Sequence, residues 1–158
     1  MKVEFVEPFV KAAFSVFESV TKTKPTRGQI SLRPASFTTQ PVTIVAGVNG
    51  GIEGTVLYGM SPITAQKVAS AMMDTESNSL DEMALSAISE LGNMITGNAA
   101  TLMSENGYDV KITPPSIVRG KDVEVSTNPP ALVVYVNTQF GRLDINVALE
   151  EKAVRKAA

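Results

Sequence analysis

The stretch at residues 80–105, LDEMALSAISELGNMITGNAATLMSE, decides the fold of this chain. Apolar residues recur in it at steps of three and four, which predicts an amphipathic helix with one buried face. Ser79 with Glu82 predicts a capping box at its start, and Asn106-Gly107 predicts a left-handed stop at its end. The apolar stripe that we expect to be buried consists of Ala84, Ile88, Leu91, Ile95, Ala99 and Leu102.

The other face of this predicted helix carries a row of polar side chains. Ser86, Glu90 and Asn93 follow one another at steps of four and three, so they project in one direction. Most surface polar residues are simply solvated. However, Gly92 and Gly97 lie in the same segment, and each glycine costs a helix about 1 kcal/mol relative to alanine. Such glycines either pack closely on a sheet or let a partner approach, so the row is a candidate functional site.

Composition excludes several kinds of chemistry. The chain has 158 residues, 44% of them hydrophobic, which is enough for a single domain (1–158) with a real core. It contains no cysteine and no histidine. Disulfides, thiolate nucleophiles and zinc–cysteine sites are therefore excluded, and the commonest general base is missing. We expect no metal site, and most of the familiar hydrolase chemistry is excluded.

Charge and hydropathy narrow the partners and the location. The net charge is −2 and no basic run occurs, so nucleic acid is not an expected partner. No apolar run approaches ~18 residues, which predicts no membrane span. The start Met1-Lys2-Val3-Glu4 begins no signal peptide, and we expect a cytoplasmic protein.

A short motif occurs twice in the chain. Residues 29–36 (QISLRPAS) are echoed by residues 109–116 (DVKITPPS), and each reads as an alternating strand that ends in a proline and a serine. Pro34 and Pro114 lie eighty positions apart. The motif therefore indicates an internal duplication.

The surroundings of the motif repeat as well. Each copy follows an amphipathic helical segment and precedes a predicted hairpin, at residues 42–58 and 132–149. We divide the chain into halves at about residues 1–78 and 79–158, each with the order helix, strand, hairpin. A short helix over residues 62–73 closes the first half. In the second half, the counterpart of this helix would be the tail at residues 150–158.

These patterns predict an α/β (α+β) fold with pseudo-two-fold symmetry. About six antiparallel strands would form a sheet covered by two long helices. The tail at residues 150–158 would form a short helix or fray. The order of the strands in the sheet does not follow from the sequence.

The repeat tests whether the polar row is architectural. Subtracting eighty places Val10 opposite Glu90 and Ala13 opposite Asn93. The first long helix therefore carries neither the acid nor the amide. This indicates that the pair serves function rather than the architecture.

A family signature matches four residues of the chain. It is an aspartate or serine, a glutamate four later, an asparagine three later and a proline a little over twenty residues beyond, here Ser86, Glu90, Asn93 and Pro115. In this signature, and in its duplicated plan, the chain resembles the CheC, CheX and FliY family of bacterial chemotaxis phosphatases. The resemblance covers nearly the whole chain. It is strongest to the CheX-like members, which carry the acid and amide on one long helix, whereas CheC-like members carry them on both.

The resemblance implies hydrolysis of the aspartyl phosphate on the response regulator CheY. The phosphorylated receiver domain would supply Mg²⁺ and a lysine, so this chain would need no cofactor of its own. As catalytic residues, Asn93 would orient the attacking water and Glu90 would pair with the receiver's lysine. The supporting, partner-binding positions would be Ser86, Gly92, Gly97 and Pro115.

Two other classes of function stay open at this point. The same face could belong to a non-catalytic adaptor that binds receiver domains, or to a scaffold module of the flagellar switch, and neither needs the amide of Asn93. The chain could also be a structural protein that assembles through sheet edges. CheX-like proteins are similar in forming homodimers through such edges, so assembly and catalysis are compatible.

Overall fold

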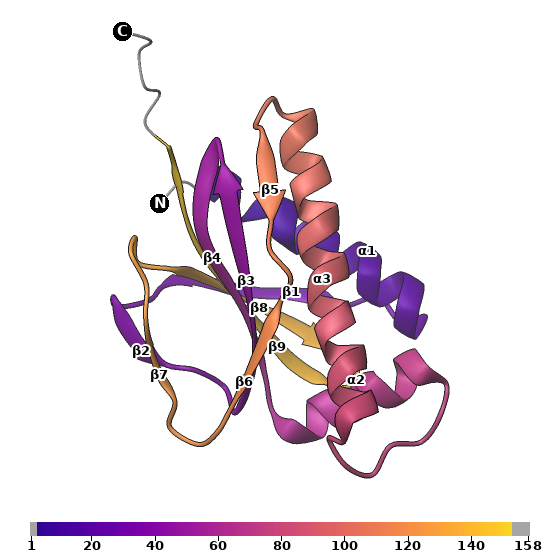
Figure 1. Ribbon diagram of the computed structural model, residues 1–158. Helices are drawn as coiled ribbons and strands as arrows, with labels where there is room; N and C mark the ends of the chain where they lie inside the picture. The colour runs from indigo at the N-terminus through magenta and orange to yellow at the C-terminus, as the bar shows by residue number, and fades with distance from the viewer. Residues whose placement is uncertain (1–2, 153–158) are drawn as a thin grey trace, which may run out of the picture.

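The computed structural model describes residues 3–152 (Figure 1). The helical elements are η1 (Val3–Phe5), α1 (Glu7–Thr21), α2 (Pro62–Met73) and α3 (Glu82–Glu105). The strands are β1 (Thr26–Leu32), β2 (Ser36–Thr38), β3 (Val42–Gly50), β4 (Ile52–Met60), β5 (Val110–Ile112), β6 (Ser116–Arg119), β7 (Glu124–Ser126), β8 (Leu132–Thr138) and β9 (Gly141–Glu151). Among the described helices, none has the length and apolar composition that crossing a membrane requires.

The main sheet has seven antiparallel strands in the order β1-β8-β9-β4-β3-β5, with β6 also pairing with β3. Hairpin β3–β4 of the first half and hairpin β8–β9 of the second meet at the centre through β4 and β9. At the edges the halves exchange strands, because β1 pairs with β8 and the β5–β6 segment pairs with β3. The order is therefore the same from either edge, as a fused duplication would produce.

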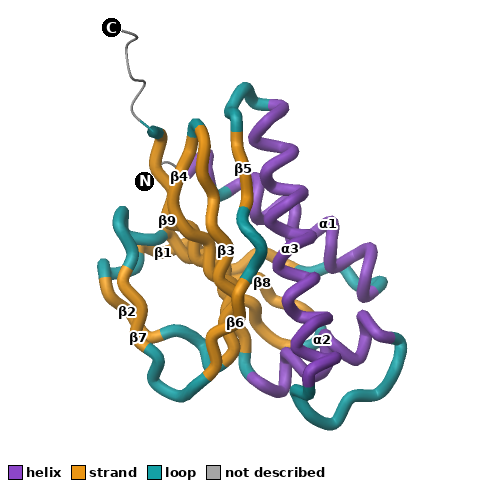
Figure 2. The backbone as a smooth tube through the Cα atoms, in the orientation of Figure 1, coloured by secondary structure: helices purple, strands orange, loops and turns teal. Residues whose placement is uncertain are grey.

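The helices and the small β2–β7 sheet lie on opposite sides of the main sheet (Figure 2). Strand β9 shows why, because its side chains alternate between two cores. Val147 and Leu149 belong to the large core under the helices, whereas Ala148 packs with Phe37 and Ala131 beneath the small sheet. This is the period-two pattern of a strand that is buried on both faces.

The α+β fold class predicted from the sequence is confirmed, although the chain has more strands than expected. The expectation of about six strands missed β2, β6 and β7, since segments of three or four residues with mixed polarity give no clear periodicity. The helix over residues 62–73 and both hairpins form as predicted. At the C-terminus, β9 continues through Glu151, and the rest of the predicted tail helix lies outside the described residues.

Helix α3 begins two residues later than predicted, and its cap differs. The N-cap is Asp81 rather than Ser79, because the Asp81 carboxylate accepts a hydrogen bond from the Ala84 N–H at 2.9 Å. Gly107, with φ of 92°, ends the helix as predicted. The buried stripe is correct up to Ala99 and then continues through Met103, while Leu102 is only half-buried.

The register of the repeat was wrong for the two long helices. Val10 and Ala13 are buried, so they are not the counterparts of exposed residues on α3. The exposed positions of α1 at matching steps of four and three are Lys11, Ser15 and Glu18. No glutamate of α1 is followed by an asparagine three residues later, so the pair is still specific to α3.

Candidate active site on helix α3

The polar row of α3 lines a cleft of about 420 Å³. Ser86, Glu90 and Asn93 are exposed along one side of it, as their spacing predicts. The opposite side is the segment between β5 and β6, which includes Pro114 and Pro115. The full lining comprises Ser86, Ser89, Glu90, Asn93, Ile112, Thr113, Pro114 and Pro115. The structure thus brings together the four residues of the sequence signature.

A β-bulge carries the two prolines to the cleft. Between the pairs Val45↔Ser116 and Val48↔Ile112, strand β3 has two residues whereas the edge segment has three, at 113–115. The extra residue interrupts the backbone hydrogen bonds between β3 and the edge segment, at the point where the two prolines have no N–H to donate. Bulges of this kind commonly redirect side chains at functional sites.

Gly47 and Thr113 hold this bulge against β3. The Thr113 N–H donates to the Gly47 carbonyl at 3.0 Å, and the Gly47 N–H donates to Thr113 Oγ1 at 3.0 Å. A Cβ on Gly47 would lie 2.8 Å from Thr113 Oγ1, so only glycine allows this approach. Sequence reasoning missed both residues, because their contact depends on the register of the edge strand.

The buried hydroxyl groups of Tyr58 and Thr96 hold the sheet-facing side of α3 in place. Thr96 Oγ1 donates to the Gly92 carbonyl at 2.7 Å, so the Tyr58 hydroxyl, 2.7 Å from Thr96 Oγ1, is the donor between the two. Burial raises the pKa of Tyr58, which keeps it neutral and able to donate. The only sequence signal for this contact was a threonine on the buried face of α3. The bond ties the middle of the helix, which carries Asn93, to β4.

The two glycines of α3 have different surroundings. Gly92 is buried, and a Cβ there would lie 2.6 Å from Ile44 Cγ2 on β3. It therefore lets the helix pack closely on the sheet, and its expected role in admitting a partner is wrong. Gly97 is half-buried, and the nearest atom to a Cβ there is Ile112 Cδ1 at 3.9 Å. Internal packing therefore does not require a glycine at this position.

The acid and the amide are free to act on another molecule. Among the described residues, no side-chain hydrogen bond or ion pair engages Ser86, Glu90 or Asn93. An exposed carboxylate can accept a hydrogen bond from a cation, and a carboxamide can both donate and accept. The described part of the chain contains no group of three or more His, Cys, Asp or Glu residues placed to hold a metal ion.

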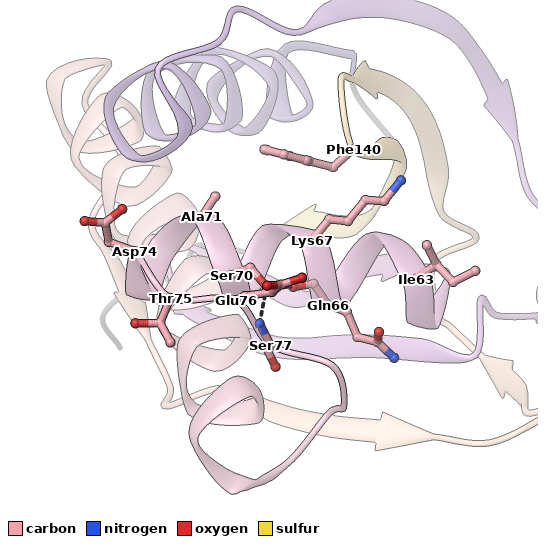
Figure 3. A pocket seen from close by; sticks show the side chains of 10 residues that line it. All are labelled: Ile63, Gln66, Lys67, Ser70, Ala71, Asp74, Thr75, Glu76, Ser77 and Phe140. Atoms are coloured by element: carbon pink, nitrogen blue, oxygen red, sulfur yellow. Dashed lines mark hydrogen bonds between the residues drawn. The ribbon is translucent and has the colours of Figure 1, made fainter.

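A second hollow, of about 610 Å³, lies along α2 and shares no lining residue with the cleft (Figure 3). It is larger, but its central polar group already has partners. Ser70 Oγ accepts from the Ser77 N–H at 2.9 Å and donates to the Gln66 carbonyl at 2.9 Å. Ile63 projects from the N-terminal end of α2, away from Asp74 at the other end (Figure 3). The smaller cleft holds all four residues of the sequence signature, which favours it as the active site.

Comparisons with known proteins agree on the family. Residues 42–137, which include the whole signature, match the family described as chemotaxis phosphatase CheX. A curated relative from Thermotoga maritima, "CheY-P phosphatase CheX", is 35% identical over 154 residues, covering 97% of this chain and 99% of the relative.

Solved structures agree on the fold. A CheC-like superfamily protein from Shewanella sp. PV-4 superposes with a TM-score of 0.85 at 22% identity, covering 95% of this chain and 99% of that one. CheX of Borrelia burgdorferi, solved in complex with CheY, BeF₃ and Mg²⁺, superposes with a TM-score of 0.78 at 27% identity, covering 95% and 100%.

The fold and the family match together define a chemotaxis phosphatase of the CheC-like fold. Within that class, the match over residues 42–137 and the 35% identity at nearly full length decide the assignment. The chain belongs to the CheX family.

Proposed function

We propose that this chain hydrolyses the aspartyl phosphate of the response regulator CheY. The observation that carries the proposal is the placement of Glu90 and Asn93, exposed and free in a cleft opposite Pro114 and Pro115. The relative from Thermotoga maritima is named as a CheY-P phosphatase, and CheX of Borrelia burgdorferi binds CheY in its crystal structure. Both support the same substrate for this chain.

Asn93 is proposed to orient the attacking water. Its carboxamide can accept a hydrogen bond from the water and donate one to it, which holds the water in line with the phosphorus. Such positioning lowers a barrier without a general base, which suits a chain without histidine. The charge on the phosphoryl group would be stabilised by the receiver's own Mg²⁺ and lysine.

Glu90 is proposed to dock the receiver. It lies one turn before Asn93 on the same face of α3, so a carboxylate–lysine contact there would align the amide with the phosphoryl group. Ser86 would add a lateral hydrogen bond one turn earlier. Pro115 would form the opposite wall of the cleft, and Gly97 would leave room for the partner beyond Asn93.

We also propose how the molecule is organised. The chain would act as one domain, because each half completes its sheet with a strand of the other half. It would form a homodimer through the edge strand β1, where Ile30 and Leu32 are exposed. A phosphatase of CheY would work in the cytoplasm, where the regulator is phosphorylated.

The test is phosphate release from phosphorylated CheY with and without this protein. We expect release to accelerate in proportion to the amount of protein added. Binding to phosphorylated CheY without acceleration would instead support the non-catalytic adaptor or switch-scaffold function.

A further inference from the structure

An apolar hollow continues the active-site cleft toward the N-terminus of α3. It has a volume of about 560 Å³ and is lined by Met73, Glu82, Met83, Ser86 and Ala87. Met83 is the most exposed large hydrophobic side chain among the described residues, at 71%. Burial within this fold therefore does not explain a large apolar residue at this position.

The hollow and the active-site cleft form one continuous surface. Ser86 lines both of them. Met83 also lies three residues before Ser86 and seven before Glu90, so all three share one face of α3. From Met83 to Asn93 the helix rises about 15 Å. A partner that places its phosphoryl group at Asn93 with its body toward the start of α3 would therefore cover Met83.

The surroundings of Met83 are suited to an apolar contact. Met73, at the C-terminal end of α2, and Ala87 line the hollow and are half-buried, whereas Glu82 and Ser86 are exposed. The Asp81 cap fixes the first turn of the helix below Met83. The flexible thioether side chain of methionine adapts to the shape of a partner.

We infer that the receiver domain that docks at Glu90 and Asn93 also buries Met83, and that this contact sets affinity rather than the rate of chemistry. The inference rests on the proposed function. The expected occupant is an apolar side chain on the receiver, about 15 Å from its phosphoryl group along the axis of α3. A second copy of this chain is not the expected occupant, because the hollow lies on the helix face of the site and not at a sheet edge.

The test compares Met83→Ala with Ile63→Ala, which removes an apolar side chain of similar exposure (63%) from α2. Met83→Ala should raise the KM for phosphorylated CheY about tenfold and leave kcat unchanged, because only the burial of an apolar side chain in the complex is lost. Ile63→Ala should change neither constant. Since both side chains are exposed, both variants should melt within a few degrees of the wild type.

A binding titration with BeF₃-treated CheY separates this inference from the proposed function. If the wild type binds but does not hydrolyse, the proposed function fails, and a weaker complex for Met83→Ala still supports the docking surface. An affinity and a KM equal to those of Ile63→Ala would overturn the inference while leaving the function intact. If the wild type neither binds nor hydrolyses, both proposals are wrong.

Discussion

At the scale of single residues, Glu90 and Asn93 lie three positions apart on one exposed helix face, yet their proposed roles have different measurable effects. The carboxylate should control how tightly the receiver binds. The carboxamide should control how fast the bound phosphoryl group is hydrolysed. Affinity and rate at saturation can therefore be assigned to separate side chains.

Glu90→Ala should weaken the complex with phosphorylated CheY about tenfold, because a charge-assisted hydrogen bond to a lysine is lost at the interface. The rate at subsaturating CheY should fall with it. Glu105→Ala removes an exposed glutamate from the other end of α3 and serves as the control. An unaltered affinity of Glu90→Ala in a titration would refute the docking role.

At the scale of the element, α3 is a helix whose glycines have opposite structural effects. Gly92 is required by the packing of α3 on Ile44, whereas Gly97 has space for a methyl group. The same substitution at the two positions should therefore change the free energy of unfolding in opposite directions.

Gly92→Ala should destabilise the fold by about 1–2 kcal/mol, because overpacking against the buried Ile44 outweighs the gain in helix propensity. Gly97→Ala should stabilise it by about 0.5–1 kcal/mol. Urea denaturation of both variants measures the difference. Equal shifts of the two midpoints would contradict the packing of α3 described above.

The elements also show what the sequence could predict. Hydrophobic periodicity was sufficient for α1 and α3, the Ser61-Pro62 start for α2, and strand pattern with turn residues for both hairpins, because these signals are local in the sequence. Short strands such as β6 and the bulge at residues 113–115 depend on pairing partners far away in the chain. The close approach of Gly92 to Ile44 likewise depends on which strand lies beneath the helix. Its position four residues after Ile88 and three before Ile95 nevertheless already placed Gly92 on the buried side. The exposed row Ser86, Glu90 and Asn93 was predictable, because spacing along one helix decides it.

At the scale of the whole molecule, the two edges of the main sheet differ. The β5–β6 edge is interrupted by Pro114 and Pro115, which cannot donate to another strand. The β1 edge presents two exposed apolar side chains, Leu32 and Ile30, of which Leu32 is 69% exposed. A long edge strand with apolar side chains favours pairing with a second chain, so β1 is the better candidate for a dimer interface.

Leu32→Lys should convert a dimer to a monomer in sedimentation at micromolar concentration, since a charge on an edge strand opposes pairing. Val118→Lys, at the opposite edge on β6, should leave the dimer intact. A wild type that sediments only as a monomer would argue against the dimer.

The proposed role of Asn93 is tested most directly by the rate at which Asn93→Ala dephosphorylates CheY at saturating protein. We expect a loss of about 100-fold or more, with the affinity for phosphorylated CheY within about twofold of the wild type, because only the positioning of water is removed. Asn98→Ala, which removes another exposed amide from α3, should keep the full rate. A rate unchanged in Asn93→Ala would contradict the central claim.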